Sequence, residues 1–152
     1  MNIVDKAELF AKERYLANDP IHQWRHIQNV MERALLIAQN FDDIDYETLK
    51  LAVIFHDIDY RSYDTHVDAS AKVAEKFLSE NNYPRERINR VKEVIFDHST
   101  PHREKQGEAE SLEGKIIYDA DKSIFITDKK TYDKYYPKLY LKETKNLVVI
   151  YK

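Results

Sequence analysis

Six residues in the middle of the chain, IFHDID at positions 54–59, place an imidazole and two carboxylates at the end of an apolar run. The preceding stretch, LKLAVIF, has the composition of a helix that enters a hydrophobic core. Burying a charge in such a core is unfavourable unless the charge is paired or binds a metal ion. His56 and Asp57 therefore predict a buried ion pair or a metal site, and Asp59 supplies a second acid close by.

Two further polar residues stand at the inner edge of apolar stripes on other predicted helices. His26 shares a face with Val30, and Asp121 shares a face with Ile117. Taken singly, such residues are more often core or surface groups than ligands. Taken together, they can converge from three helices, as metal ligands do in helical bundles. The candidate metal ligands are His26, His56, Asp57 and Asp121.

Two imidazoles and two carboxylates make a mixed nitrogen and oxygen site without sulfur. Such a site suits a divalent ion, and Mn²⁺, Fe²⁺ and Mg²⁺ are the expected ones. Four protein ligands on an octahedral ion leave about two positions for water or substrate oxygen. A site of this kind can polarise a phosphate and lower the pKa of bound water, which is what metal-assisted hydrolysis requires.

The elements that must position these residues are predicted to be helical. Apolar residues recur at the helical period, and the chain has only two glycines, which disfavours a turn-rich β fold. The expected helices cover residues 2–17, about 21–41, about 45–56, about 67–80, 85–97 and about 112–127. Residues 59–66 and the polar stretch 99–110 are expected to be loops, and the second is expected to be the most mobile.

The length of 152 residues suits a single domain with one core. Its motif-bearing part spans about 21–127, and residues 128–152 form a C-terminal extension whose LVVIY end fits a helical turn or a short strand. The predicted fold class is all-α, a bundle of about six or more helices around the metal site. A homodimer contact through the extension is one possible partner interaction.

Composition excludes several classes of function. The net charge of −3 provides no basic surface for nucleic acid, and the absence of cysteine excludes disulfides, thiolate catalysis and cysteine-bound zinc. The N-terminus has no apolar segment typical of a signal peptide, and no apolar run approaches the ~18 residues of a membrane span. We therefore expect a cytoplasmic protein that binds neither nucleic acid nor membrane.

The ordered motifs resemble those of the HD superfamily of metal-dependent phosphohydrolases. The supporting stretches are HxxxH at 22–26, FHDID at 55–59 and SLEGKIIYDADKS at 111–123, with HVDAS and DHS between them. The family pattern H…HD…D falls on the four candidate ligands, and the resemblance runs from about residue 21 to 127. It implies an HD-type helical bundle, a divalent metal and cleavage of phosphoester or phosphoanhydride bonds. The likeness is to small bacterial HD hydrolases, some of which act on nucleotides.

The resemblance also separates the two acids of the DAD motif. The last Asp of the family precedes a basic residue, and here Asp121 precedes Lys122. Helical geometry agrees, because residue 119 lies about 200° around the helix from residue 121. Asp119 is then expected to be an acceptor behind the ligands or a surface charge.

Two more histidines are expected to contact phosphate or to support the ligands. His66 and His98 bind a second metal ion in the alternative interpretation. The short gap between Asp57 and His66 differs from the spacing associated with two-metal relatives, and the second ion is therefore not the preferred interpretation.

Four residues are candidates for catalysis and phosphate binding. Asp59 stands where many relatives have glycine, and it either orients the attacking water as a general base or caps the following turn. His22 either donates to the substrate or makes local hydrogen bonds at a helix start. Arg61 and Lys122 are the preferred cationic partners for phosphate.

Three hypotheses for function follow. The first is a metal-dependent phosphohydrolase acting on a small phosphorylated substrate, with nucleotides as the preferred class. The second is a nucleotide-binding or signalling module with little turnover. The third is a di-iron HD-type oxygenase, which requires His66 and His98 at a second iron ion.

Overall fold

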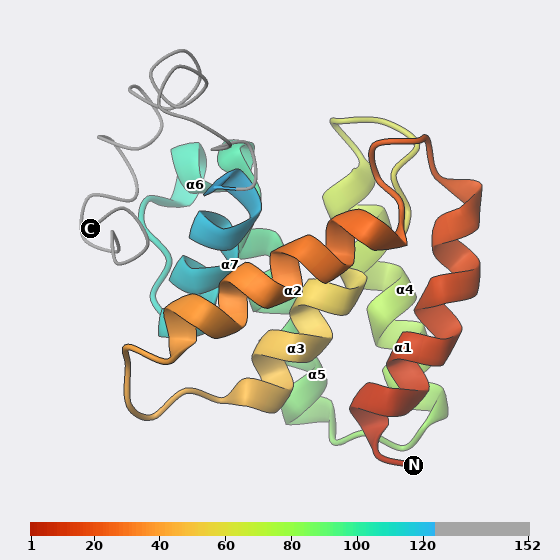
Figure 1. Ribbon diagram of the computed structural model, residues 1–152, viewed down its shortest axis with the longest axis horizontal. Helices are drawn as coiled ribbons and strands as arrows, with labels where there is room; N and C mark the ends of the chain where they lie inside the picture. The colour runs from red at the N-terminus through yellow and green to blue at the C-terminus, as the bar shows by residue number, and fades with distance from the viewer. Residues whose placement is uncertain (124–152) are drawn as a thin grey trace.

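The computed structural model describes residues 1–123, which form helices and the loops between them (Figure 1). In chain order the elements are α1 (Ile3–Arg14), the 3-10 turn η1 (Tyr15–Ala17), α2 (Trp24–Ala38), α3 (Tyr46–Phe55), α4 (His66–Glu80), α5 (Arg85–Asp97), α6 (Thr100–Gln106) and α7 (Leu112–Ser123). The predicted all-α fold is confirmed, since residues 1–123 contain no strand. The expected extension over 128–152 and the end of the last predicted helix lie outside the described residues.

Helix α3 is the centre of the bundle. It contacts α1, α2, α4, α5 and α7, and seven of its ten residues are buried. A helix that is apolar on every side must be covered on every side, which explains why so many neighbours surround it. Asp45 caps its start, where the carboxylate accepts a hydrogen bond from the backbone N–H of Thr48 at 3.1 Å. The end of α3, where His56 follows, is consequently inside the molecule.

Aromatic rings connect α3 to the helices around it. Phe10, Phe55 and Phe77 come from α1, α3 and α4, and the rings of Phe10 and Phe77 stack with centroids 4.6 Å apart. Trp24 begins α2, and its ring lies 5.9 Å from that of Tyr15. On the other side of α3, α2 contacts α7, and α5 contacts both α4 and α7. In this part of the chain, none of the helices combines the length and apolarity that crossing a membrane requires.

Helix α2 begins later than the sequence pattern predicts. Residues 18–23 form a loop, because the Asp19 carboxylate accepts hydrogen bonds from the backbone N–H groups of Ile21 and His22 at 2.9 and 3.2 Å. Gln23 donates through Nε2 to the Asn18 carbonyl oxygen at 2.6 Å and holds the loop closed. The helix predicted over about 21–41 therefore begins at Trp24, and His22 lies in the loop before it rather than on the helix.

The polar stretch 99–110, predicted as a loop, contains the short helix α6. Ser99 caps the helix by accepting a hydrogen bond from the backbone N–H of His102. Arg103 is buried on the inner side of α6 and forms an ion pair with Asp97 at 2.8 Å. A helical cap and a buried ion pair order residues whose polarity alone suggested a loop.

Candidate metal centre

The end of α3 presents two adjacent side chains to one place. The Val53 carbonyl accepts a hydrogen bond from Nδ1 of His56 at 2.7 Å, and the Ile54 carbonyl accepts one from the Tyr15 hydroxyl at 2.6 Å. Side-chain donors thus replace the backbone N–H groups that would continue the helix. The chain turns after His56, so that Asp57 can face the same point although adjacent helical residues differ by about 100°.

The four predicted ligands come together as a buried group, the four-residue cluster. Its members are His26 of α2, His56 and Asp57 after α3, and Asp121 of α7. Nε2 of His26 lies 3.2 Å from both Asp57 Oδ2 and Asp121 Oδ1. Nε2 of His56 lies 3.3 and 3.4 Å from the same two oxygens. One oxygen from each acid therefore faces both imidazoles.

The orientation of these atoms fits a cation at their centre. The Nε2 atoms of His26 and His56 are buried and have no hydrogen-bond partner of normal geometry among residues 1–123. They are nonetheless within 3.4 Å of two carboxylate oxygens, and one potential ligand atom from each residue lies within 4.8 Å of the others. Buried polar atoms are rarely left without partners, and lone pairs that face a common point are what a metal ion satisfies.

Charge inside the cluster is strongly coupled. Burial tends to raise the pKa of both acids, but His56 acting on Asp57 and Lys122 acting on Asp121 contribute to holding each pKa well below its usual range. Burial tends to lower the pKa of His56, but the two carboxylates raise it to about 10. Both acids are thus anionic, and the protonated imidazoles balance their negative charge. A bound cation would replace the protons on the imidazoles.

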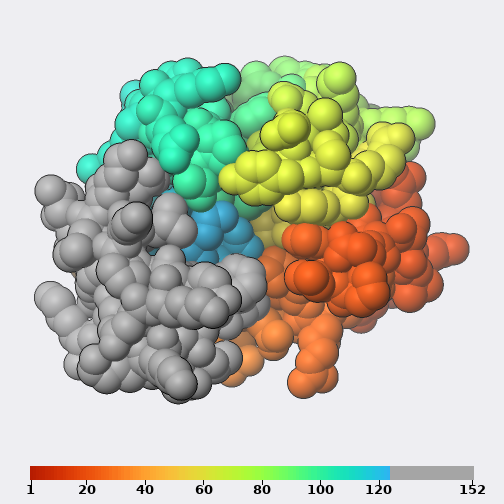
Figure 2. Space-filling model, turned by 90° about the horizontal axis from the view of Figure 1, so that it is seen from above, coloured from red at the N-terminus to blue at the C-terminus, as the bar shows by residue number. Residues whose placement is uncertain are grey.

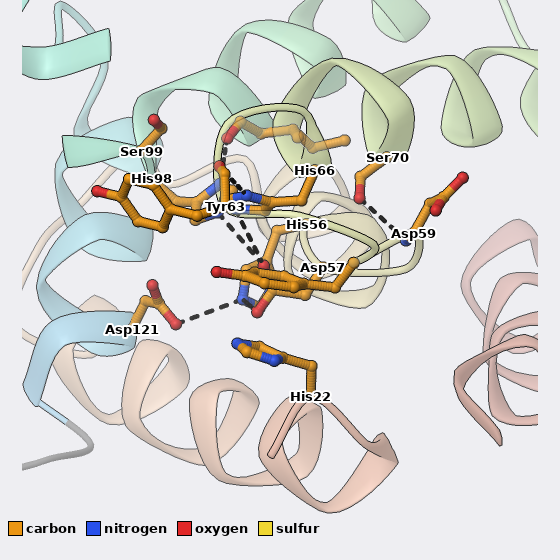
Figure 3. A network of polar contacts seen from close by, with 12 residues as sticks. His22, His56, Asp57, Asp59, Tyr63, His66, Ser70, His98, Ser99 and Asp121 are labelled. Carbon is orange, nitrogen blue, oxygen red and sulfur yellow. Dashed lines mark hydrogen bonds and ion pairs between the residues drawn. The ribbon is translucent and has the colours of Figure 1, made fainter. Parts of the chain in front are cut away.

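The other oxygen of Asp57 faces a second group of histidines. Asp57, His66 and His98 form the three-residue cluster, in which Asp57 Oδ1 lies 3.6 Å from His66 Nε2 and 3.5 Å from His98 Nε2. Nδ1 of each histidine donates to the carbonyl three residues earlier, which leaves Nε2 directed at the acid (Figure 3). Burial lowers the pKa of both histidines, which favours the neutral form that binds metals. This arrangement favours the second-ion alternative for these two residues.

A cavity of about 190 Å³ adjoins both clusters. It is bordered by the loop before α2, the loop after α3, the start of α6 and the end of α7, which meet on one face of the molecule (Figure 2). His22 borders the cavity; its Nδ1 bonds the Asp19 carboxylate at 2.8 Å and its ring stacks on Tyr60. Lys122 also borders it, with Nζ 3.0 Å from Asp121 Oδ2. Both residues are placed where they could touch a substrate.

Two predicted residues do not join the site. The carboxylate of Asp59 receives both Nε and Nη2 of Arg61 at 2.9 Å, and neither residue borders the cavity beside the clusters. Figure 3 shows Asp59 to one side, with its backbone N–H bound by Ser70 and its carboxylate turned away from Asp57. The geometry gives no support to a general base at Asp59 or to phosphate binding by Arg61. Asp119 is fully buried, which excludes the surface-charge alternative for it.

Among the residues that border the cavity, Ile21, Ser99, Thr100 and Pro101 were missed from the sequence. Thr100 and Pro101 line it at the start of α6, in the stretch predicted to be a loop. The signal was present, because a serine followed by proline in the next turn is typical of a helix start. The polarity of the rest of the stretch concealed it.

The comparisons with known proteins agree with this geometry. A family model described as HD domain matches residues 24–124, which includes all four members of the four-residue cluster. Neither the curated proteins nor the solved structures gave a match. The match covers most of the chain and includes α2 to α7, the helices that carry the ligands. The chain therefore belongs to the HD domain family.

Proposed function

We propose that the protein is a metal-dependent phosphohydrolase that cleaves a phosphoester or phosphoanhydride bond of a small phosphorylated substrate, with nucleotides as the first class to test. The observation that carries the proposal is the four-residue cluster, a buried site of two imidazoles and two carboxylates beside a cavity. Mn²⁺, Fe²⁺ and Mg²⁺ suit these ligands. HD family membership supports hydrolytic, metal-dependent chemistry in general.

The roles of the side chains follow from their positions. When bound, the ion supplies the polarisation of a phosphate oxygen and the lowered pKa of a coordinated water. His26, His56, Asp57 and Asp121 hold it. Lys122 approaches the cavity from α7 and offsets negative charge on the phosphate, while His22 faces the cavity from the opposite loop and can donate a proton to the substrate.

The test begins with metal analysis of the purified protein. Phosphate or pyrophosphate release is then measured with Mn²⁺ on a panel of nucleotides and small phosphomonoesters. His56→Ala removes a fully buried candidate ligand and is expected to lose metal and turnover together. His102→Ala is the matched control, because this histidine belongs to neither cluster and its contact is with the ring of Phe96.

Each result decides between hypotheses. Metal bound without turnover of any panel member would refute the hydrolase, and nucleotide-induced thermal shifts in that case would support a binding or signalling module. If His56→Ala leaves the metal content unchanged, the ion does not bind in the four-residue cluster.

The three-residue cluster favours one further candidate, a di-iron oxygenase. That chemistry requires a second iron, and Asp57, His66 and His98 offer three ligand atoms for one. Protein loaded with Fe²⁺ under anaerobic conditions should then hold about two irons per chain and consume dioxygen with an organic substrate. One iron or fewer per chain would exclude this candidate.

A further inference from the structure

Asn18 lies where the loop before α2 meets the loop after α3, and both N–H donors and the oxygen of its side-chain amide form hydrogen bonds. Nδ2 donates one hydrogen bond to the Asp57 carbonyl oxygen at 2.8 Å and one to the His22 carbonyl oxygen at 2.9 Å. Oδ1 accepts a hydrogen bond from the backbone N–H of Tyr60 at 3.3 Å. One side chain therefore connects three backbone positions at the candidate site.

The bond to Asp57 fixes the residue that both clusters share. Asp57 follows the end of α3, where no further helical turn holds its carbonyl. Neighbouring bonds hold the turn on either side, from Ile58 N–H to the Phe55 carbonyl and from Asp59 N–H to the Ser70 hydroxyl. Asn18 adds a constraint on the Asp57 backbone itself, from which the carboxylate extends toward the histidines of both clusters.

The other two bonds order the border of the cavity. The rings of His22 and Tyr60 stack with centroids 3.6 Å apart and planes 9° apart. The Tyr60 ring also stacks on the ring of His66, a member of the three-residue cluster, with centroids 4.2 Å apart. By binding the backbone of both His22 and Tyr60, Asn18 holds this stack of three rings in register beside the clusters.

Asn18 lies outside the part of the chain that matches the HD family model, which begins at residue 24. In Figure 1 the loop between α1 and α2 lies beside the loop that follows α3, at the same end of the bundle. Tyr15, also outside the match, binds the Ile54 carbonyl one turn before Asp57. The N-terminal segment thus binds the backbone of the HD motif at Asp57 and the last turn of α3 before it at Ile54.

We propose that Asn18 is a positioning residue of the metal centre, which aligns Asp57 for metal binding and fixes the aromatic border of the substrate cavity. The inference rests on the proposed metal dependence but not on the identity of the substrate. Residues that orient metal ligands without touching the ion commonly change metal affinity by 10- to 100-fold when they are replaced.

The test measures Mn²⁺ affinity by calorimetry on the metal-free full-length chain, together with the thermal midpoint of each variant. Asn18→Ala is expected to weaken Mn²⁺ binding by about 10- to 100-fold. Asn18→Asp keeps the acceptor for Tyr60 N–H but loses both donors, and it should weaken binding similarly. Gln23→Ala is the control, because Gln23 closes the same loop through the carbonyls of Asn18 and Asp19 rather than through Asp57.

Equal Mn²⁺ affinity in wild type and in Asn18→Ala, with only a lower thermal midpoint, would overturn the proposal and leave Asn18 a structural residue. If Asn18→Ala does not fold, Asn18→Asp provides the comparison; failure of both to fold would also overturn it. Wild-type protein that binds no divalent ion would refute both the metal centre and the role of Asn18. Wild-type binding without turnover would refute the hydrolase alone.

Discussion

At the scale of the residue, Asp57 is shared by the two clusters of candidate ligands. Oδ2 faces His26 and His56, and Oδ1 faces His66 and His98. A carboxylate that is shared in this way can join two ions, as in two-metal sites with ions about 3.5–4 Å apart. The number of bound ions then depends on the histidines on the Oδ1 side.

Replacing one of those histidines should remove one ion only. His66→Ala deletes a candidate ligand of the three-residue cluster and leaves the four-residue cluster complete, so a protein that holds about two ions per chain should then hold about one. Elemental analysis after Mn²⁺ loading and desalting measures it. His102→Ala should keep the wild-type content. Two ions retained in His66→Ala would show that His66 is not a ligand.

Asp59 is the residue for which the sequence and the structure suggest different roles. Its carboxylate is engaged by Arg61, away from the cavity, and Asp59→Asn should therefore leave metal content and kcat/KM within about twofold of wild type. Steady-state kinetics on whichever substrate the panel identifies provides the measurement. A loss of tenfold or more in kcat with metal retained would restore the water-orienting role that its position in IFHDID suggested.

At the scale of the element, α7 must approach α5 closely to bring Asp121 into the cluster. Gly114 lies in the first turns of α7, where an added Cβ would stand 2.1 Å from Asp97 Oδ2 and 3.0 Å from the Cβ of Ala109. Real Cβ atoms do not approach other atoms so closely, and the Asp97–Arg103 ion pair would have to move.

Gly114→Ala is consequently expected to destabilise the fold by about 1–3 kcal/mol through overpacking. The sign of this change distinguishes overpacking from helix propensity, because replacing glycine by alanine within an exposed helix would stabilise the protein by up to about 1 kcal/mol. Urea unfolding followed by circular dichroism measures the difference. A variant as stable as wild type would show that α5 and α7 can separate without loss.

Asp45 makes the stability of α3 depend on pH. Burial tends to raise the pKa of Asp45, but hydrogen bonds from Thr48 and Arg87 hold it below the ordinary value of 3.8. A lowered pKa in the folded state stabilises the protein above the unfolded value, and this stabilisation is lost as the pH falls through the folded value. Asp45→Ala should lower the free energy of unfolding by about 1 kcal/mol at pH 7.

The difference between wild type and Asp45→Ala should then shrink as the pH falls below about 4. Asp45→Asn retains a capping group and should lose only the contribution of the charge. A difference that does not change with pH would attribute the effect to packing.

At the scale of the whole molecule, the hydrophobic pattern was sufficient for the fold class and for most helices. The pattern also identified His26, His56 and Asp121, because each stands in register with apolar neighbours, whereas Asp57 was found because it directly follows His56 at the end of an apolar run. It failed where polar contacts override local pattern. Asp19 delays the start of α2, and the capping of Ser99 with the ion pair of Arg103 orders α6. The Asp59 carboxylate is turned toward Arg61, and the spacing of residues in the sequence did not predict this orientation.

A bound ion should stabilise the whole bundle, since its ligands join α2, the end of α3 and α7. An ion at 100 times its dissociation constant adds about 2.7 kcal/mol, which corresponds to a rise in thermal midpoint of roughly 5–10 °C. Because the pKa of His56 is about 10, the ion must displace a proton, and the rise should be larger at pH 8 than at pH 6. Differential scanning fluorimetry with Mn²⁺, reversed by a chelator, measures it; no shift at either pH would contradict metal binding.

Trp24 is the only tryptophan of the chain, and it stands two residues before His26, with its ring against Tyr15. Its indole N–H is buried and has no hydrogen-bond partner among the residues described, while the side chain as a whole is half-buried and Lys12 Nζ lies 5.7 Å from the centre of the ring. Trp24 begins the helix that carries the candidate ligand His26, and its ring packs on the N-terminal segment that holds the HD motif, so metal binding that tightens this segment should change the Trp24 emission. The protein thus carries its own optical reporter of metal loading, and no label needs to be attached.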